Sequence, residues 1–250
     1  MCATCGCSDD AGVRVTDPHH GHGHGTGHGA GHGDDTRTVS LEVDLLAKND
    51  VIADRNRRRF SELGVVTLNL MSSPGSGKTT LLERTITDLA GAMPCAVLEG
   101  DQETLLDADR IGATGARVVQ INTGAGCHLD ADMVVDGLRT LDIERGSLLF
   151  VENVGNLVCP ALFDLGESAR VVIISVTEGT DKPLKYPHMF RTADLVLVNK
   201  IDLLPYVDFD VPRCVSYARR ANPDVEVLEV AATRGDGLDA WYDWLRVRSP

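Results

Sequence analysis

The stretch of residues 71–80, M-S-S-P-G-S-G-K-T-T, constrains the fold of this chain more than any other. It follows an apolar run at residues 65–70 and precedes residues 81–84, L-L-E-R, which favour a helix. A strand, a glycine-rich turn, Lys-Thr and a helix together make a P-loop, whose backbone N–H groups and helix N-terminus surround a polyphosphate. The stretch therefore predicts a binding site for a nucleoside triphosphate.

The residues of this loop have separate predicted roles. Lys78 is expected to reach the β- and γ-phosphates and Thr79 to bind Mg²⁺. Ser72 stands where the pattern G-x-x-x-x-G-K-[ST] usually has its first glycine, a mild departure because the later glycines remain. The predicted nucleotide contacts in the loop are Gly75, Ser76, Gly77, Lys78, Thr79 and Thr80.

Seven apolar runs alternate with helical segments from residue 65 onward. Runs that are apolar almost throughout are typical of parallel strands covered on both faces. Helices are predicted at residues 130–141 and 238–246, and from an N-cap at Ser40 through Phe60. The predicted fold is α/β, a doubly wound and mostly parallel sheet with ligands at the carboxyl ends of its strands. The strands are expected at residues 65–70, 95–99, 117–121, 148–152, 170–176, 194–199 and 225–230.

Residues 199–202, N-K-I-D, follow one of these strands. The Asp202 carboxylate can accept both the ring N–H and the exocyclic amine of guanine, whereas adenine presents an acceptor at the ring position. Alone, the motif also fits an ordinary turn with a helix cap. At a strand end downstream of a P-loop, Asn199, Lys200 and Asp202 predict a preference for GTP. Ala232, after the last strand, could offer a backbone N–H to the guanine oxygen.

Acidic residues follow two further strands that should end near the P-loop. Mg²⁺ prefers hard oxygen ligands, so Asp101 and Glu152 are candidates for direct or water-mediated contacts to the ion. Together with Lys78 and Thr79 they form the predicted catalytic set. Gly155 could donate its N–H to the γ-phosphate. The alternative for each acid is a helix N-cap or a solvated loop charge.

Residues 1–36 differ in composition from the rest of the chain and are assigned to a separate tail, with a GTPase domain at 37–250. Removal of Met1 would free the α-amine of Cys2. With the thiolates of Cys2, Cys5 and Cys7, this amine makes an N,S ligand set that could be planar for Ni²⁺ or tetrahedral for Zn²⁺. Residues 8–36 are predicted to be disordered, because glycine-rich chains cannot bury enough apolar surface to offset their conformational entropy.

A histidine-glycine run occupies residues 19–33. Imidazole suits nickel, zinc and copper, so the run predicts a metal reservoir of low specificity. The alternative is a run with no role. Its histidines are His19, His20, His22, His24, His28 and His32.

A second group of metal-ligating residues is predicted in the GTPase domain. Cys127 and His128 are adjacent, and Cys159 follows the segment after Glu152 that should respond to the γ-phosphate. A metal ligand at Cys159 would couple metal to nucleotide state. Adjacency is expected to strain convergence of Cys127 and His128 on one ion, so that a second copy of the chain supplies further ligands across a two-fold axis. In isolation, each residue is more often a half-buried thiol or a satisfied histidine.

Composition excludes several classes of partner. A formal net charge of −13 argues against nucleic acid and anionic membrane surfaces. No apolar run approaches about 20 residues and no signal-peptide pattern opens the chain, so neither a spanning helix nor a leader is expected. The seven cysteines cluster as metal ligands do, which favours reduced thiols and a cytoplasmic location.

Taken together and in this order, the motifs resemble those of the HypB family of hydrogenase nickel-incorporation GTPases. The resemblance covers almost the whole chain. It is carried by Cys2, Cys5, Cys7, the histidine run and residues 72–79, 99–102 (E-G-D-Q), 126–129 (G-C-H-L), 152–160 (E-N-V-G-N-L-V-C-P) and 199–202.

The resemblance implies a GTPase of the signal-recognition-particle and nitrogenase-iron-protein class that forms a GTP-dependent homodimer. It implies slow hydrolysis of GTP coupled to insertion of nickel into the [NiFe]-hydrogenase large-subunit precursor, with a HypA-type maturation protein as partner. It also implies Ni²⁺ at the N-terminal cysteines, and Ni²⁺ or Zn²⁺ at Cys127, His128 and Cys159 near the dimer interface.

Three other functions compete with this interpretation. Urease accessory GTPases typically carry a contiguous Cys-Pro-His, and zinc-delivering GTPases usually carry Cys-x-Cys-Cys after the P-loop; both patterns are absent here. The third alternative is a nickel storage protein whose GTPase domain only gates release of the metal.

Overall fold

The computed structural model describes residues 34–101, 106–124 and 126–249. Two compact units divide the chain, at residues 1–48 and 49–250, and the division falls within helix α1 (Asp34–Leu63). The described part of the first unit, residues 34–48, is helical throughout. The predicted boundary between residues 36 and 37 stays a prediction. The tail ligands lie outside the described residues: Cys2, Cys5, Cys7, His19, His20, His22, His24, His28 and His32.

One seven-stranded sheet forms the centre of the second unit, in the order β3-β2-β4-β1-β5-β6-β7. All neighbouring strands are parallel. The seven predicted strands are confirmed, and their ends differ from prediction by at most two residues. The strands are β1 Val66–Ser72, β2 Cys95–Asp101, β3 Arg117–Asn122, β4 Leu148–Glu152, β5 Ala169–Ser175, β6 Leu195–Asn199 and β7 Glu226–Glu229.

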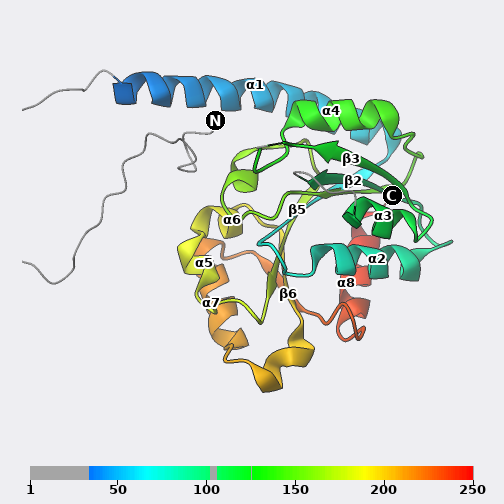
Figure 1. The fold of residues 1–250 in the computed structure, drawn as a ribbon, viewed down its shortest axis with the longest axis vertical. Helices are drawn as coiled ribbons and strands as arrows, with labels where there is room; N and C mark the ends of the chain where they lie inside the picture. The colour runs from blue at the N-terminus through cyan, green and yellow to red at the C-terminus, as the bar shows by residue number, and fades with distance from the viewer. Residues whose placement is uncertain (1–33, 102–105, 125, 250) are drawn as a thin grey trace, which may run out of the picture. The chain divides into compact units, whose positions relative to one another are not determined.

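Helices cover both faces of the sheet, and Figure 1 shows α2 and α8 on one side and α4 on the other. Side chains of a strand alternate between the faces, so Leu70 packs with α2 and α8 while Met71 packs with α6 and α7. The helices are α2 Lys78–Leu89, α3 Leu106–Gly112, α4 Ala131–Thr140, α5 Lys182–Lys185, α6 Pro187–Arg191, α7 Val211–Ala221 and α8 Leu238–Arg248, with short 3₁₀ turns η2 Cys159–Leu162 and η3 Ile201–Tyr206.

The helix boundaries include one correction. The predicted helix at 130–141 is confirmed as α4, and its N-cap Asp130 accepts a hydrogen bond of 2.8 Å from the Met133 N–H. The prediction that Ser40 caps the first helix is wrong, because α1 begins at Asp34. No glycine or proline separates Gly33 from Ser40 to stop the helix, and acidic residues such as Asp34 are favoured in a first turn.

Among the helices of the described residues, none combines the length and the apolar character needed to cross a bilayer.

β1 lies at the centre of the sheet, between β4 and β5. In a doubly wound sheet, ligands bind beyond the carboxyl ends of the strands, where the strand order reverses. The loop that follows β1 is therefore the loop best placed to hold a ligand, and it is the predicted P-loop.

Candidate nucleotide and metal sites

The P-loop turns directly from β1 into α2. Gly77 is the N-cap of α2 and has a φ of 93°, in the left-handed region that favours glycine. A Cβ at this position would lie 2.6 Å from Nδ2 of Asn199, so a larger residue is excluded by contact as well as by backbone conformation. The turn therefore leaves the N-terminus of α2 open for a phosphate.

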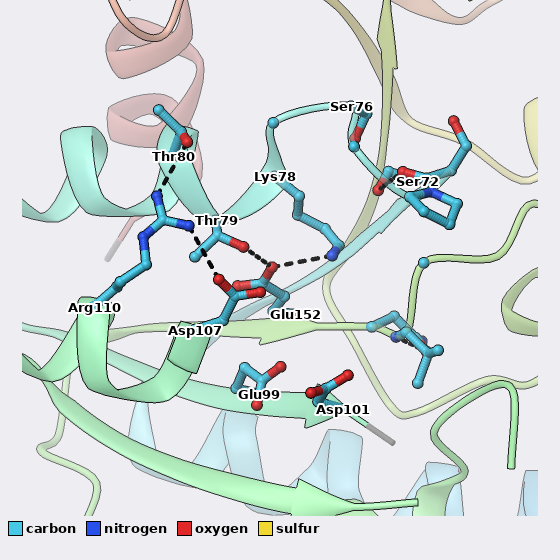
Figure 2. A pocket seen from close by; sticks show the side chains of 18 residues that line it. Ser72, Ser76, Lys78, Thr79, Thr80, Glu99, Asp101, Asp107, Arg110 and Glu152 are labelled. Carbon is cyan, nitrogen blue, oxygen red and sulfur yellow. Dashed lines mark hydrogen bonds and ion pairs between the residues drawn. The ribbon is translucent and has the colours of Figure 1, made fainter. Parts of the chain in front are cut away.

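A pocket of 460 Å³ opens beside this loop (Figure 2). Its walls are the P-loop, the ends of β2 and β4, and two residues of α3, Asp107 and Arg110. All of the residues predicted to contact phosphate or Mg²⁺ line it: Gly75, Ser76, Gly77, Lys78, Thr79, Thr80, Asp101, Glu152 and Gly155.

Glu152 joins the two P-loop side chains with predicted catalytic roles. Its Oε1 lies 3.0 Å from Nζ of Lys78 and accepts a 2.8 Å hydrogen bond from Oγ1 of Thr79 (Figure 2). The residue is 1% exposed, and within the described part of the chain its Oε2 has no hydrogen-bond partner. A buried carboxylate beside a threonine hydroxyl fits the hard oxygen ligands of Mg²⁺. Thr79, Glu152 and Asp101 are therefore the residues that would hold the ion.

Glu99 is a second buried carboxyl group in this pocket. The sequence places it in the motif at residues 99–102, but no role was predicted for it. It lies in register with Glu152 on the neighbouring strand and is 3% exposed. Burial, reinforced by the nearby Glu152 carboxylate, raises the pKa of Glu99 to about 8. The burial and the neighbouring carboxylate therefore favour the protonated form of Glu99.

The residues predicted to read guanine do not line this pocket, and two of them contact the P-loop. Nδ2 of Asn199 donates to the Ser76 carbonyl at 2.9 Å, and Nζ of Lys200 donates to the Gly75 carbonyl at 2.7 Å. Both contacts therefore tie the end of β6 to carbonyl groups of the P-loop. Asp202 follows in the first turn of η3 and is half-buried.

The predicted contact of Ala232 with guanine stays a prediction. Its backbone N–H donates to Oδ1 of Asn199 at 3.1 Å and so helps to orient that side chain. This hydrogen bond forms because β7 pairs with β6, which brings the chain after β7 against the end of β6.

The three predicted metal ligands of this domain lie together in one chain. Ligand atoms of Cys127, His128 and Cys159 are all within 4.8 Å of one another, with 3.0 Å between the two sulfurs and 3.7 Å from the Cys127 sulfur to Nδ1 of His128. The expectation that adjacency would strain their convergence is wrong. Cys127 and His128 lie in a bend, where adjacent side chains are not sent to opposite faces as they are in a strand.

His128 is held in the state that binds metal. Its ring stacks on Phe163 with 3.9 Å between ring centroids and 22° between ring planes. Burial lowers the pKa of His128, which favours the neutral imidazole. Within the described residues the group offers three ligands, so a four-coordinate ion would take its fourth from solvent or from another chain.

Comparison with known proteins decides the family. Residues 66–229 match the family described as CobW/HypB/UreG, nucleotide-binding domain. Hydrogenase maturation factor HypB of Escherichia coli strain K12 is 53% identical over 232 residues, which cover 93% of this chain and 80% of that protein. The HypB protein of Azotobacter vinelandii is 60% identical over 210 residues, covering 84% and 69%. This chain belongs to the HypB family.

Solved HypB structures share the fold. HypB from Helicobacter pylori, in complex with nickel, aligns with a TM-score of 0.77 and 38% identity over 80% of this chain and 94% of that one. HypB from Archaeoglobus fulgidus aligns with a TM-score of 0.75 and 41% identity over 80% and 98%. The predicted resemblance to the HypB family and the predicted P-loop GTPase fold are confirmed.

Two pocket residues of this HypB-family chain were not found by sequence reasoning. Asp107 and Arg110 lie on α3 with Nη1 of Arg110 3.0 Å from Oδ1 of Asp107. Their only sequence signal is an acid and an arginine three residues apart, which also fits an ordinary ion pair on a helix surface. Only the fold shows that α3 borders the nucleotide pocket.

Proposed function

We propose that this chain is a GTP-hydrolysing nickel metallochaperone that helps insert nickel into the large-subunit precursor of [NiFe]-hydrogenase. One observation carries the proposal: Glu152 of the nucleotide pocket and Cys159 of the metal cluster belong to a single short segment, residues 152–159. A change at the phosphate end of that segment can therefore reach a metal ligand. The HypB structure solved in complex with nickel supports nickel as the cargo.

The same geometry supports slow hydrolysis of GTP. Lys78 would exchange its ion pair with Glu152 for the β- and γ-phosphates, where its charge is most useful as the γ-phosphate departs. Mg²⁺, when held by Thr79, Asp101 and Glu152, would supply further neutralisation of phosphate charge. Gly155 lines the pocket close to the P-loop, where a Cβ would lie 3.1 Å from Pro74, and its N–H is proposed to reach the γ-phosphate.

The preference for guanine can be tested at Asp202. We expect Asp202→Asn to weaken GTP binding by roughly 10- to 100-fold, because the charge is lost and one of the two acceptor oxygens becomes an NH₂ donor that faces a donor of guanine. Xanthine offers an acceptor where guanine has its amine, so xanthosine triphosphate should now compete with GTP. The measurement is displacement of a fluorescent GDP analogue by GTP, ATP and xanthosine triphosphate.

Asp208→Asn is the matched control for this substitution, since Asp208 is exposed and lies outside the motif. It should leave all three affinities unchanged. Comparable binding of ATP and GTP by the unsubstituted chain would contradict the proposed specificity.

Metal transfer is proposed to depend on a GTP-dependent homodimer. Cys127, His128 and Cys159 suit either Ni²⁺ or Zn²⁺, and a two-fold interface would bring two such sets together. A HypA-type maturation protein and the hydrogenase precursor are the proposed partners. Because the site needs reduced thiols, we propose a cytoplasmic location.

The proposal is tested in cells with a gene that encodes Cys159→Ala. Hydrogenase activity should fall in normal medium and recover when nickel is added in excess, because delivery becomes unnecessary at high metal concentration. A strain with Cys95→Ala serves as the control, since Cys95 lies outside the cluster. Full activity of the Cys159→Ala strain at low nickel would instead favour a storage role.

The tail is proposed to bind nickel by itself through Cys2, Cys5, Cys7 and the Cys2 amine. A peptide of residues 1–7 without Met1 should give a thiolate-to-Ni²⁺ charge-transfer band on addition of the ion. Acetylation of the Cys2 amine should change that band, because a ligand would be lost. An unchanged spectrum after acetylation would exclude the amine while leaving the three thiolates as ligands.

A further inference from the structure

Arg110 extends from α3 to the rim of the nucleotide pocket, facing the first turn of α2 (Figure 2). Its Nη2 lies 3.2 Å from Oγ1 of Thr80, the P-loop residue after Thr79. The Glu83 carboxylate of α2 accepts hydrogen bonds from Nε at 3.2 Å and from Nη2 at 2.5 Å. The Asp107 carboxylate accepts one from Nη1 at 3.0 Å. The guanidinium is therefore fixed in orientation from three sides.

These contacts do not use all of the guanidinium donors. Arginine has five N–H groups. The Nε–H and one Nη2 N–H donate to Glu83, the other Nη2 N–H donates to Thr80, and one Nη1 N–H donates to Asp107. One Nη1 N–H has no partner in the part of the chain that the structure describes. The side chain is 44% exposed, so a ligand in the pocket can reach it. The hydrogen bond to Glu83 raises the pKa of Arg110, which keeps the charge permanent.

The pocket wall has more acidic than basic side chains, so each basic side chain matters for binding a polyphosphate. Among the described lining residues, Glu99, Asp101, Asp107 and Glu152 are acidic, whereas Lys78 and Arg110 are the basic ones. A nucleoside triphosphate brings several negative charges into this acidic surrounding. Lys78 is placed for the β- and γ-phosphates. Arg110 is then the basic side chain that remains for the α-phosphate, the phosphate nearest the guanine base.

We infer that Arg110 is a nucleotide-binding residue that contacts the α-phosphate from the α3 side of the pocket. The position of Thr80 carries this assignment. Thr80 is the third residue of α2, and the N–H groups of this first turn face the α- and β-phosphates. Gly155 and Lys78 serve the γ-phosphate instead. Because GDP and GTP share the α-phosphate, Arg110 contributes equally to the binding of both. The inference rests on the proposed nucleotide-dependent function.

A purely structural role for Arg110 makes a different prediction. The pair with Glu83 joins α3 to α2, so Arg110 could act only as a clamp between these helices. Glu83→Gln weakens that clamp but keeps the guanidinium. It is the matched control for substitutions at Arg110.

The experiment titrates the full-length chain with fluorescent GDP and with a fluorescent, non-hydrolysable GTP analogue. Arg110→Ala should weaken both by the same factor, about 10- to 100-fold for lost hydrogen bonds to a charged group. Arg110→Lys should recover part of the affinity, because lysine keeps the positive charge but lacks the planar set of N–H donors of a guanidinium group. Glu83→Gln should bind both nucleotides within about threefold of the unsubstituted chain, since no phosphate contact is removed.

Three results would overturn the inference. They are unchanged affinity of Arg110→Ala, loss of affinity confined to the GTP analogue, and an equal loss in Glu83→Gln. Thermal unfolding without nucleotide shows that each variant is folded before it is titrated. Failure of the unsubstituted chain to bind guanine nucleotides would instead refute the proposed function, so the two failures are distinguishable.

Discussion

Lys78→Ala is expected to reduce the rate of GTP hydrolysis by at least about 100-fold, the loss typical when one preorganised charged or hydrogen-bonding group is removed from a transition state. The Lys78 side chain is only 12% exposed, and its Nζ lies 3.0 Å from Glu152 at the mouth of the P-loop. Alanine removes the charge that is proposed to meet the β- and γ-phosphates and leaves the Glu152 carboxylate without that partner. Release of inorganic phosphate at saturating GTP measures the effect.

Lys185→Ala is the control for the Lys78 substitution. Lys185 lies on α5, its side chain is 62% exposed, and its ion pair with Asp181 is outside the nucleotide pocket. Its loss should leave hydrolysis unchanged. Phosphate release by Lys78→Ala at the unsubstituted rate would contradict the assignment of this lysine to the phosphates.

The second large effect is expected in metal binding. In a shortened chain of residues 37–250, Cys127→Ala should lower the affinity for Ni²⁺ and Zn²⁺ by on the order of 100-fold or more, since loss of an outer-sphere partner alone typically costs 10–100-fold. The Cys127 sulfur is 3.0 Å from that of Cys159, so the substitution removes one of three convergent ligands. Competition with a chromogenic chelator measures the affinity. Cys95→Ala should retain it, and retention by Cys127→Ala would remove the site.

Nucleotide state should alter this affinity. Cys159 and Glu152 share one segment, so the γ-phosphate is expected to rearrange the cluster. Thermodynamic linkage then requires the metal to change GTP affinity by the same factor as GTP changes metal affinity. Titrations with Ni²⁺ in the presence of GDP and of a non-hydrolysable GTP analogue measure both. Equal metal affinities in the two states would rule out nucleotide-gated transfer through this site.

The fold was predictable from sequence to an unusual extent because its signals are local. A parallel strand covered on both faces is apolar along most of its length, and residues 171–174, V-V-I-I, show this directly. The P-loop was equally clear, because left-handed turns at Gly75 and Gly77 need glycine. The start of α1 was less clear, since a serine that suits an N-cap at position 40 also fits inside a helix.

The parts of the site that escaped prediction depend on contacts between distant segments. Cys127 and Cys159 were predicted as metal ligands, but their convergence with His128 within one chain was not. The two cysteines are 32 residues apart and meet only because the β3–α4 loop lies against the start of η2. Arg110 reaches the pocket because α3 packs beside α2, which no local pattern announces. The contact between the Ala232 N–H and Asn199 was missed for the same reason, since it joins the chain after β7 to the end of β6.

The order of strands in the sheet also sets when the nucleotide site can form during synthesis. β1 carries the P-loop, but its partners are β4 and β5, and not β2 or β3, which follow it in the chain. The strand therefore leaves the ribosome about 80 residues ahead of its first neighbour, roughly 4–16 s earlier at typical rates of synthesis. Residues 1–36 are synthesised before β1 and β4, so the cysteines and histidines among them leave the ribosome before the nucleotide site can form.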